Sequence, residues 1–456
     1  MHSKFSLSHC LTLGSCSLGL LTLLTVVQAE DWTRFRGSNG DGISPDSAPT
    51  KWSPTENIKW KTKLPGAGVS CPIVLGGKIF LTCYSGYGIA AGDPGNPADL
   101  KRHVVCVNRT DGEIIWDRAI DSTAAEDAYS GMGVPEHGYA SHTPVTDGEA
   151  VYAFLGKSGV YAFDLDGKQL WHTEVGTGSD RRRWGSASSP MLAGDVLVVP
   201  AIAESSSLIG LDKKTGKQIW KEETDALGNS WSTPLLVKVD DNRSDLVMPV
   251  GGEVWGINPA NGKLRWFCTD IPGDSFYTSL SSRDGIVYGS VGGRSGGGSF
   301  AIKVGGKDDV TKTNMVWQGS DQSSYATPVL HNNRMFIASR GVATAIDTQT
   351  GKQLEKVRLE SSVDNAPASP AGGNPRGGGR GGFGGDYSSP VVANGKLYYV
   401  KRNGEMFVFD AGTELKQLAV NRVTTESEEF SATPAICDGQ IFVRSNKNLY
   451  CIEAAQ

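Results

Sequence analysis

One short pattern recurs eight times along this chain of 456 residues: a pair of mostly small residues, in most copies followed by proline, opens a short apolar strand. The copies begin at Ser70, His142, Ser188, Ser232, Thr278, Ala326, Ser388 and Ala432. Most copies continue through a turn containing Gly or Asn into a second apolar strand, which predicts a β-hairpin. The chain is therefore expected to fold as eight units of similar design.

The later part of each unit predicts a second turn followed by a strand that carries tryptophan. In the third unit Asp212 opens the turn, Gly216 lies inside it, and Trp220 follows in the next strand. The acidic side chain caps the turn, Gly supplies a positive φ, and the indole is expected to pack between neighbouring units. The predicted docking residues are Trp60, Trp116, Trp171, Trp220 and Trp266, whereas Glu355 and Leu418 replace Trp in two repeats.

Four strands per unit at a spacing of about 45 residues predict the blades of a propeller, because each sheet buries its faces only against its neighbours. The 58 glycines and a charged content of 20% suit short strands and tight turns better than long helices. The last repeat ends before a fourth strand, while residues 57–61 supply such a strand without a repeat before it. We therefore predict an all-β fold, an eight-bladed β-propeller of four-stranded antiparallel blades, closed by an N-terminal strand.

The docking element resembles a known family. The segment from Asp212 to Trp220 follows the pattern Asp-x-x-Thr-Gly-Lys-x-x-Trp, which is similar to the tryptophan-docking motif of pyrroloquinoline-quinone-repeat (PQQ-repeat) propellers. That family includes quinoprotein alcohol dehydrogenases and BamB-like outer-membrane assembly proteins. The opening from Asp31 to Gly42 also resembles the start of propellers secreted by planctomycete-type bacteria. The resemblance implies the fold, but not one function, because propellers carry unrelated chemistries.

The first residues are of a different kind. Lys4 precedes an apolar run from Leu11 to Val27 that ends at Ala29, which is typical of a cleavable signal peptide. We predict a signal peptide at 1–29, an N-terminal arm at 30–56 and the propeller at 57–456. The protein is then exported to the periplasm or secreted, without a transmembrane segment. Lipidation at Cys16 is a less favoured alternative, because the apolar run continues past it.

Six cysteines follow the leader: Cys71, Cys83, Cys106, Cys268, Cys437 and Cys451. Export permits disulfides, and bridges within the first or last blade are plausible. Unpaired core thiols fit the sequence equally well, so the pairing stays open.

No catalytic or metal-binding motif is recognisable. The histidines after the leader show no ligand spacing, and no GxSxG elbow is present. Quinoprotein dehydrogenases, as a family, use a vicinal disulfide and calcium, whereas this chain has no Cys-Cys pair. We therefore predict no catalytic residues, no metal and no cofactor, with PQQ and calcium only under an oxidoreductase alternative.

An aromatic residue precedes the opening strand in seven repeats. Because the entries to the innermost strands surround one mouth of the channel, these rings are expected to line a pocket, together with basic residues nearby. The candidate ligand-binding residues are Tyr139, Trp184, Trp231, Tyr277, Tyr325, Tyr387, Phe430, Arg183 and His142. Packing of the same rings between blades is the structural alternative.

The remaining features concern partners. A Gly- and Arg-rich stretch at about 362–386 cannot form a core and is expected to be a disordered loop.

The net charge of −5 gives no general reason to bind nucleic acid. The favoured function is a monomeric, non-catalytic binding or assembly scaffold for a protein or carbohydrate partner in the cell envelope. The alternative is a PQQ-dependent oxidoreductase.

Overall fold

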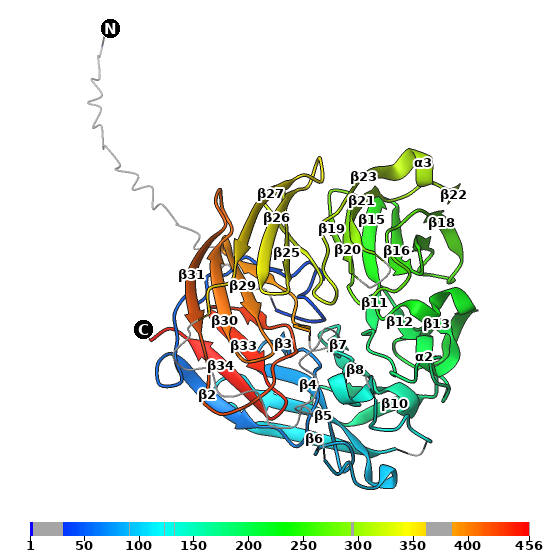
Figure 1. Cartoon of the computed structure of the whole chain (residues 1–456), viewed down its shortest axis with the longest axis vertical. Helices are drawn as coiled ribbons and strands as arrows, with labels where there is room; N and C mark the ends of the chain where they lie inside the picture. Colours follow the sequence, from blue (N-terminus) through cyan, green and yellow to red (C-terminus); the bar gives the residue numbers. More distant parts are fainter. Residues whose placement is uncertain are drawn as a thin grey trace.

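The eight repeats form eight sheets of four antiparallel strands each, and the sheets stand around a common axis (Figure 1). The computed structural model describes residues 1–2, 31–90, 92–122, 124–131, 133–292, 296–361 and 385–455. The predicted leader, apart from its first two residues, and residues 362–384 of the predicted loop lie outside this part. The expected all-β, eight-bladed propeller is confirmed.

Within each of the first four blades the strands follow chain order from the inner to the outer edge. The strands are β3 (Ile73–Leu75), β4 (Lys78–Ser85), β5 (Lys101–Asn108) and β6 (Ile114–Asp121); β7 (Val145–Thr146), β8 (Ala150–Phe154), β9 (Val160–Asp164) and β10 (Gln169–Thr173); β11 (Met191–Ala193), β12 (Val196–Ala201), β13 (Ser207–Asp212) and β14 (Gln218–Glu223); β15 (Leu235–Asp240), β16 (Arg243–Val250), β17 (Glu253–Ile257) and β18 (Leu264–Cys268). A short strand, β22 (Asp308–Asp309), adds a fifth, parallel strand to the outer edge of the fourth blade.

The next three blades repeat this order, and in the eighth blade β2 from the N-terminal part of the chain forms the outer strand. Their strands are β19 (Ser281–Arg283), β20 (Ile286–Val291), β21 (Gly298–Lys303) and β23 (Met315–Gly319); β24 (Val329–His331), β25 (Arg334–Ser339), β26 (Val342–Asp347) and β27 (Gln353–Arg358); β28 (Val391–Ala393), β29 (Lys396–Val400), β30 (Met406–Asp410) and β31 (Lys416–Asn421); β32 (Ala435–Cys437), β33 (Gln440–Arg444), β34 (Asn448–Glu453) and β2 (Ile58–Lys63).

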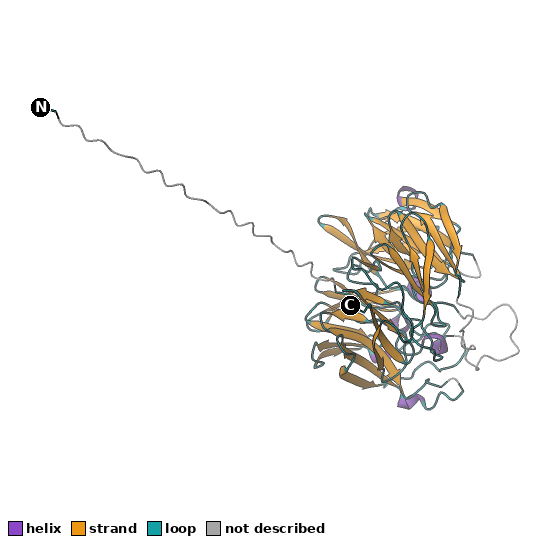
Figure 2. Ribbon diagram, turned by 90° about the vertical axis from the view of Figure 1, so that its left-hand side faces the viewer, coloured by secondary structure: helices purple, strands orange, loops and turns teal. Residues whose placement is uncertain are grey.

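Helices are short and lie in connections between strands (Figure 2). They are η1 (Pro97–Asp99), α1 (Val134–His137), η2 (Gly156–Ser158), α2 (Ile202–Ser205), η3 (Asp225–Asn229) and α3 (Thr311–Asn314). In the described part of the chain, no helix is both long enough and apolar enough to cross a bilayer.

The ring closes through β2, as the sequence predicted. This strand pairs antiparallel with β34, and Trp60 lies opposite Cys451. The indole Nε1 of Trp60 donates to the carbonyl oxygen of Arg109 in the first blade at 3.0 Å. The N-terminal strand therefore completes the eighth blade and joins it to the first.

Neighbouring blades dock through the same tryptophan contact. In each case the indole Nε1 donates to a backbone carbonyl in the turn of the next blade. The pairs are Trp116 with Leu165 (3.1 Å), Trp171 with Lys213 (3.0 Å), Trp220 with Pro259 (3.0 Å) and Trp317 with Thr348 (2.8 Å). A glycine lies under each ring. At Gly216, where φ is +70°, a Cβ atom would come within 2.6 Å of the Trp171 ring.

Two docking positions depart from this pattern. The Nε1 of Trp266 donates to Asp245 Oδ2 in its own blade at 2.7 Å. Glu355, which replaces tryptophan, accepts the backbone N–H of Leu415 in the seventh blade at 2.7 Å. Trp317 was not predicted, because the residues between β21 and β23 interrupt the usual turn-to-tryptophan spacing.

The N-terminal arm packs into the disc. Trp32 pairs with Val74 on the first inner strand, and β1 (Ile43–Ser44) pairs in parallel with β28 on the seventh blade. Arg36 is buried and donates to the carbonyl oxygens of Thr327, Pro328 and Pro390. The segment therefore links inner strands on different sides of the axis.

The six described cysteines are all buried and free, with no disulfide between them. Cys83 and Cys451 lie in the cluster between the eighth and first blades, where they pack as small apolar residues. The structure thus favours the core-thiol alternative over bridges within a blade.

Candidate functional site

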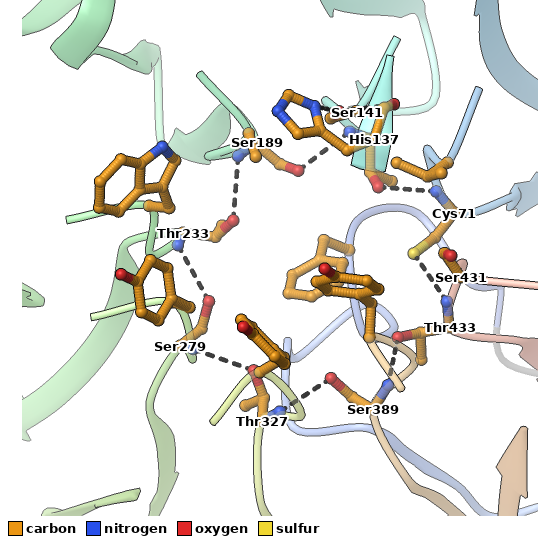
Figure 3. A pocket seen from close by; sticks show the side chains of 18 of the residues that line it. Cys71, His137, Ser141, Ser189, Thr233, Ser279, Thr327, Ser389, Ser431 and Thr433 are labelled. Carbon is orange, nitrogen blue, oxygen red and sulfur yellow. Dashed lines mark hydrogen bonds between the residues drawn. The ribbon is translucent and has the colours of Figure 1, made fainter. Parts of the chain in front are cut away.

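A closed ring of hydrogen bonds surrounds the axis where the chain enters the inner strands (Figure 3). One residue from each blade donates its backbone N–H to the side chain of the equivalent residue in the next blade, at 2.9–3.2 Å. The residues are Cys71, Thr143, Ser189, Thr233, Ser279, Thr327, Ser389 and Thr433. The second residue of the repeated small pair thus fixes the spacing of all eight blades, and the sulfur of Cys71 closes the ring.

A second tier lies two residues earlier in every blade. Because alternate residues of an extended chain point to the same side, this tier also faces the axis. On blades four to seven it consists of aromatic residues: Trp231, Tyr277, Tyr325 and Tyr387. On the other blades it consists of smaller residues: Val69, Ser141, Ala187 and Ser431. One half of the mouth is therefore filled with rings, and the other half is open.

Trp184 joins the four aromatic residues from a different position in its repeat. Consecutive ring centroids lie 4.7–5.7 Å apart, from Trp184 through Trp231 and Tyr277 to Tyr325 and Tyr387. These spacings are typical of favourable aromatic pairs. We refer to these five residues as the aromatic wall.

The two tiers enclose a cavity of about 190 Å³, which we call the mouth cavity. Phe35 of the N-terminal arm also lines it, and the same residue lines a second, small cavity that includes Arg36, Pro190 and Leu235. The arm therefore forms the floor. The mouth cavity is a blind pocket with an aromatic wall, a hydroxyl-rich lower tier and an opposite side of small residues.

Helix α1 reaches across the mouth. Its Glu136 accepts a hydrogen bond from Arg402 Nη1 at 2.5 Å and another from the Tyr387 hydroxyl at 3.2 Å. Arg402 also donates to Glu429 at 2.9 Å. Burial alone lowers the pKa of Arg402, but the carboxylates of Glu429 and Glu136 raise it above its usual range. This ion-pair network ties the first connection between blades to the seventh blade.

His137 stands beside Glu136 and lines the cavity. Its Nε2 lies 2.6 Å from the carbonyl oxygen of Trp184, and its Nδ1 lies 2.7 Å from the Ser141 hydroxyl. Since a carbonyl only accepts, Nε2 carries the proton and Nδ1 accepts from Ser141. Burial lowers the pKa of His137 below its usual value. The imidazole is therefore neutral and orients the Trp184 backbone.

Four of the predicted site residues do not line the mouth cavity. Tyr139 and Phe430 fall outside the register of the second tier and are buried, packing against Tyr84 and Tyr450 respectively. His142 is buried against Phe154. Arg183 is exposed at a turn with φ of +55°.

The basic residue that reaches the aromatic wall is Arg182. Its guanidinium carbon lies 4.9 Å from the Trp184 ring centroid and 5.8 Å from that of Trp231. Its Nη1 donates to the Tyr277 hydroxyl at 2.9 Å. Arg182 is the middle residue of the run Arg181-Arg182-Arg183, and the geometry of the turn brings this residue to the wall instead of the predicted Arg183.

A small polar cavity of about 30 Å³ lies behind the wall, with Trp184 and His137 lining both cavities. Glu204 is buried there: Oε1 accepts from Ser186 at 2.5 Å, while Oε2 has no hydrogen-bond partner among the described residues. Burial raises the pKa of Glu204 to about 7. Burial also lowers the pKa of His142, which bonds the same serine, to about 3. Both groups are therefore held towards their neutral forms.

A three-residue hydrogen-bond chain lies elsewhere, on the first blade. His103 Nε2 lies 2.8 Å from Ser85 Oγ, and His103 Nδ1 lies 2.9 Å from Asp117. This order is that of a serine-hydrolase triad. Here the serine lies under the link between the eighth and first blades, because a Cβ on Gly66 would be 3.3 Å from the Ser85 Cβ. We interpret the chain as a structural link across β4, β5 and β6.

Within the described ranges, no group of three His, Cys, Asp or Glu side chains is arranged to hold a metal ion. Among the described residues that line the mouth cavity, Glu136 is the one carboxylate, and it is already bound by Arg402. The mouth cavity therefore offers a ligand aromatic rings for stacking and hydroxyl groups for hydrogen bonding.

Comparison with known proteins gives consistent relatives. A family model described as outer membrane protein assembly factor BamB matches residues 97–248. The protein of that name from Yersinia pestis is 26% identical over 256 residues, which cover 51% of this chain and 60% of that protein. The match thus spans less than two thirds of the relative.

Solved structures show the same fold. BamB from Moraxella catarrhalis superimposes with a TM-score of 0.55 at 12% identity, over 87% of this chain and 97% of that one. A europium-containing methanol dehydrogenase superimposes with a TM-score of 0.59 at 10% identity, over 92% and 98%. At these identities the likeness concerns the fold alone.

Eight blades, docked by tryptophan at five of their contacts and closed by an N-terminal strand, form a β-propeller whose blind mouth cavity is the candidate binding site. The repeat motif and the matches make the chain similar to BamB and to other PQQ-repeat β-propellers.

Proposed function

We propose that the chain is a non-catalytic binding scaffold of the cell envelope, and that its mouth cavity holds a segment of a partner protein. The observation that carries this proposal is the asymmetry of the second tier. Rings from blades four to seven face small residues across a pocket of about 190 Å³. Aromatic residues that are partly exposed and fixed on a rigid frame are favoured in recognition sites.

The relatives support an assembly role. The matching family model and the Yersinia pestis protein carry the description outer membrane protein assembly factor. Transfer of that role would place this chain in the periplasm, which agrees with the predicted leader. A carbohydrate is the second ligand class that would stack on the wall.

Site-directed photo-crosslinking tests the proposal. A benzophenone amino acid at Ser431, on the small side of the mouth cavity, is expected to give one adduct in living cells of the source organism. The matched control places it at Leu418, an exposed residue on the outer strand β31. A protease-sensitive adduct only at position 431 supports a protein partner, and a glycan adduct indicates a carbohydrate. Equal labelling at both positions, or none at position 431, contradicts the proposal.

The oxidoreductase alternative fits these residues poorly. PQQ is a planar tricarboxylate, which needs cationic groups around it. Among the described residues that line the mouth cavity there is no arginine or lysine, and burial holds His137 towards its neutral form. Of the nearby arginines, Arg402 is already paired with Glu136 and Glu429, and Arg182 is stacked on the aromatic wall. We therefore expect no stoichiometric binding when the purified protein is titrated with PQQ and calcium. Tight binding in that titration would favour the enzyme.

A further inference from the structure

The aromatic wall already holds a ligand-like group from the chain itself. The Arg182 guanidinium lies over Trp184 and Trp231, and its Nη1 and Nη2 lie 2.9 Å from the Tyr277 hydroxyl and 3.4 Å from Ser275 Oγ. A planar, weakly hydrated guanidinium stacks well on aromatic faces, whereas a compact ammonium does not make the same flat contact.

The turn that carries Arg182 is built to present it. The Asp180 carboxylate accepts the backbone N–H groups of Arg182, Trp184 and Gly185, each at 2.8 Å. The Arg183 N–H also donates to the Asp180 carbonyl. These bonds fix the backbone on both sides of Arg182, so its side chain starts beside the wall.

The contact is nevertheless easy to displace. Arg182 is exposed, and among the described residues no salt bridge involves it. An exposed cation–π contact is weak, so a guanidinium held by further contacts to the cavity would replace Arg182.

We propose that the aromatic wall recognises an arginine side chain of an extended partner segment, and that Arg182 occupies this arginine position while the partner is absent. This inference rests on the proposed function and adds the chemistry of the partner. The arginine stacks on Trp184 and Trp231 and donates to Tyr277. The segment on either side of it lies along the small residues opposite the aromatic wall.

Titration of the whole mature protein tests this assignment, with tryptophan fluorescence as the readout. The probe is a capped Gly-Arg-Gly peptide, compared with the same peptide carrying citrulline or lysine and with free arginine amide. The arginine peptide is expected to bind Arg182→Ala about two- to fivefold more tightly than the unchanged protein, because the internal competitor is gone. Arg181→Ala removes the same charge from the same segment and is expected to leave the affinity unchanged. Citrulline and lysine peptides bind more weakly to both variants. If free arginine amide bound as tightly as the capped peptide, only the guanidinium group would be recognised, and the proposed binding of an extended peptide segment would be wrong.

Trp231→Ala is expected to abolish the response to the arginine peptide. Circular dichroism confirms that this variant is folded, and Trp231→Phe, which keeps a ring, restores part of the binding. Equal affinity of Arg182→Ala and Arg181→Ala, or no preference for arginine over citrulline, would overturn the inference. A crosslinked partner at position 431 together with no response to the arginine peptide leaves the proposed function standing without this inference.

Discussion

Burial determines the protonation state of the Glu204 side chain. Its carboxyl group lies in the small cavity behind Trp184, bonded to Ser186 on one oxygen only. A buried carboxylate without full hydrogen bonding is costly, so the folded protein favours the neutral acid. The same cavity keeps His142 neutral from the other side of the serine. Below about pH 7 these groups therefore form an uncharged support for the backbone that carries the aromatic wall.

Replacement of Glu204 by Gln is expected to change the pH dependence of stability. The pKa of Glu204 is raised from 4.5 to about 7, so between these values the folded state holds more protons than the unfolded state. The contribution of Glu204 to the free energy of unfolding is therefore fully present below pH 4.5 and is lost as the pH rises through 7. The total is on the order of 3 kcal/mol.

Urea unfolding of both proteins at pH 4 and pH 8 measures the effect. Glu204→Gln is expected to gain in free energy of unfolding relative to the unchanged protein as the pH rises. Titration of His142 changes stability with pH in the opposite direction, but it does so in both proteins and therefore cancels in the difference between them. Glu174→Gln, at an exposed position, is the control. A difference that is the same at both pH values would contradict the assignment.

Neighbouring blades are held together by one repeated tryptophan contact, and the contact made by Trp60 differs from the others because it lies where the ring closes. Four interior blades send an indole onto the next turn, where a glycine leaves room for the ring. Trp60 makes the same contact, but it stands on β2, which comes from the other end of the chain. Loss of the Trp60 indole therefore removes a contact between blades and also weakens the attachment of β2, the outer strand of the eighth blade.

We expect Trp60→Ala and Trp171→Ala to lose similar stability, about 3–5 kcal/mol each, because each loses a buried indole. Only Trp60→Ala is expected to associate, because release of β2 exposes the edge of β34. Urea unfolding and size-exclusion chromatography with light scattering at several concentrations measure both quantities. Association of Trp171→Ala to the same extent would argue against a special role for the closure.

For the whole molecule, the N-terminal arm decides that the channel ends blindly. Arg36 donates to backbone carbonyls of the sixth and seventh blades, and Phe35 beside it forms the cavity floor. The arm therefore joins blades and shapes the candidate site at once.

Arg36→Met is expected to lower the free energy of unfolding by roughly 3 kcal/mol or more, since buried carbonyls lose their donor. Arg34→Met is the matched control, because Arg34 Nε donates to Ser38 within the arm itself. Denaturant unfolding compares the two variants. If Arg34→Met cost as much as Arg36→Met, the contacts between blades would not explain the role of the arm.

Much of the architecture could be predicted from the sequence, because a blade is a local unit. Its strands, turns and docking tryptophan lie within about 45 residues, and the positions of Trp60 and Trp220 follow from that period alone. The site was predicted in part. Trp231, Tyr277, Tyr325 and Tyr387 share one register, two residues before the ring of hydroxyl groups, and that spacing distinguishes them from Tyr139 and Phe430.

The sequence by itself determined the number of blades, four of the docking tryptophans and the strand that closes the ring. Only the tertiary structure decided that the arm closes the channel, that Arg182 covers the wall, and that Glu136 meets Arg402 across the mouth. The physical reason is distance along the chain. A repeated pattern records contacts within a blade and between adjacent blades. The contacts of the arm and of Glu136 with Arg402 join residues hundreds of positions apart, and the contact of Arg182 depends on the conformation of its turn, so no local pattern records them.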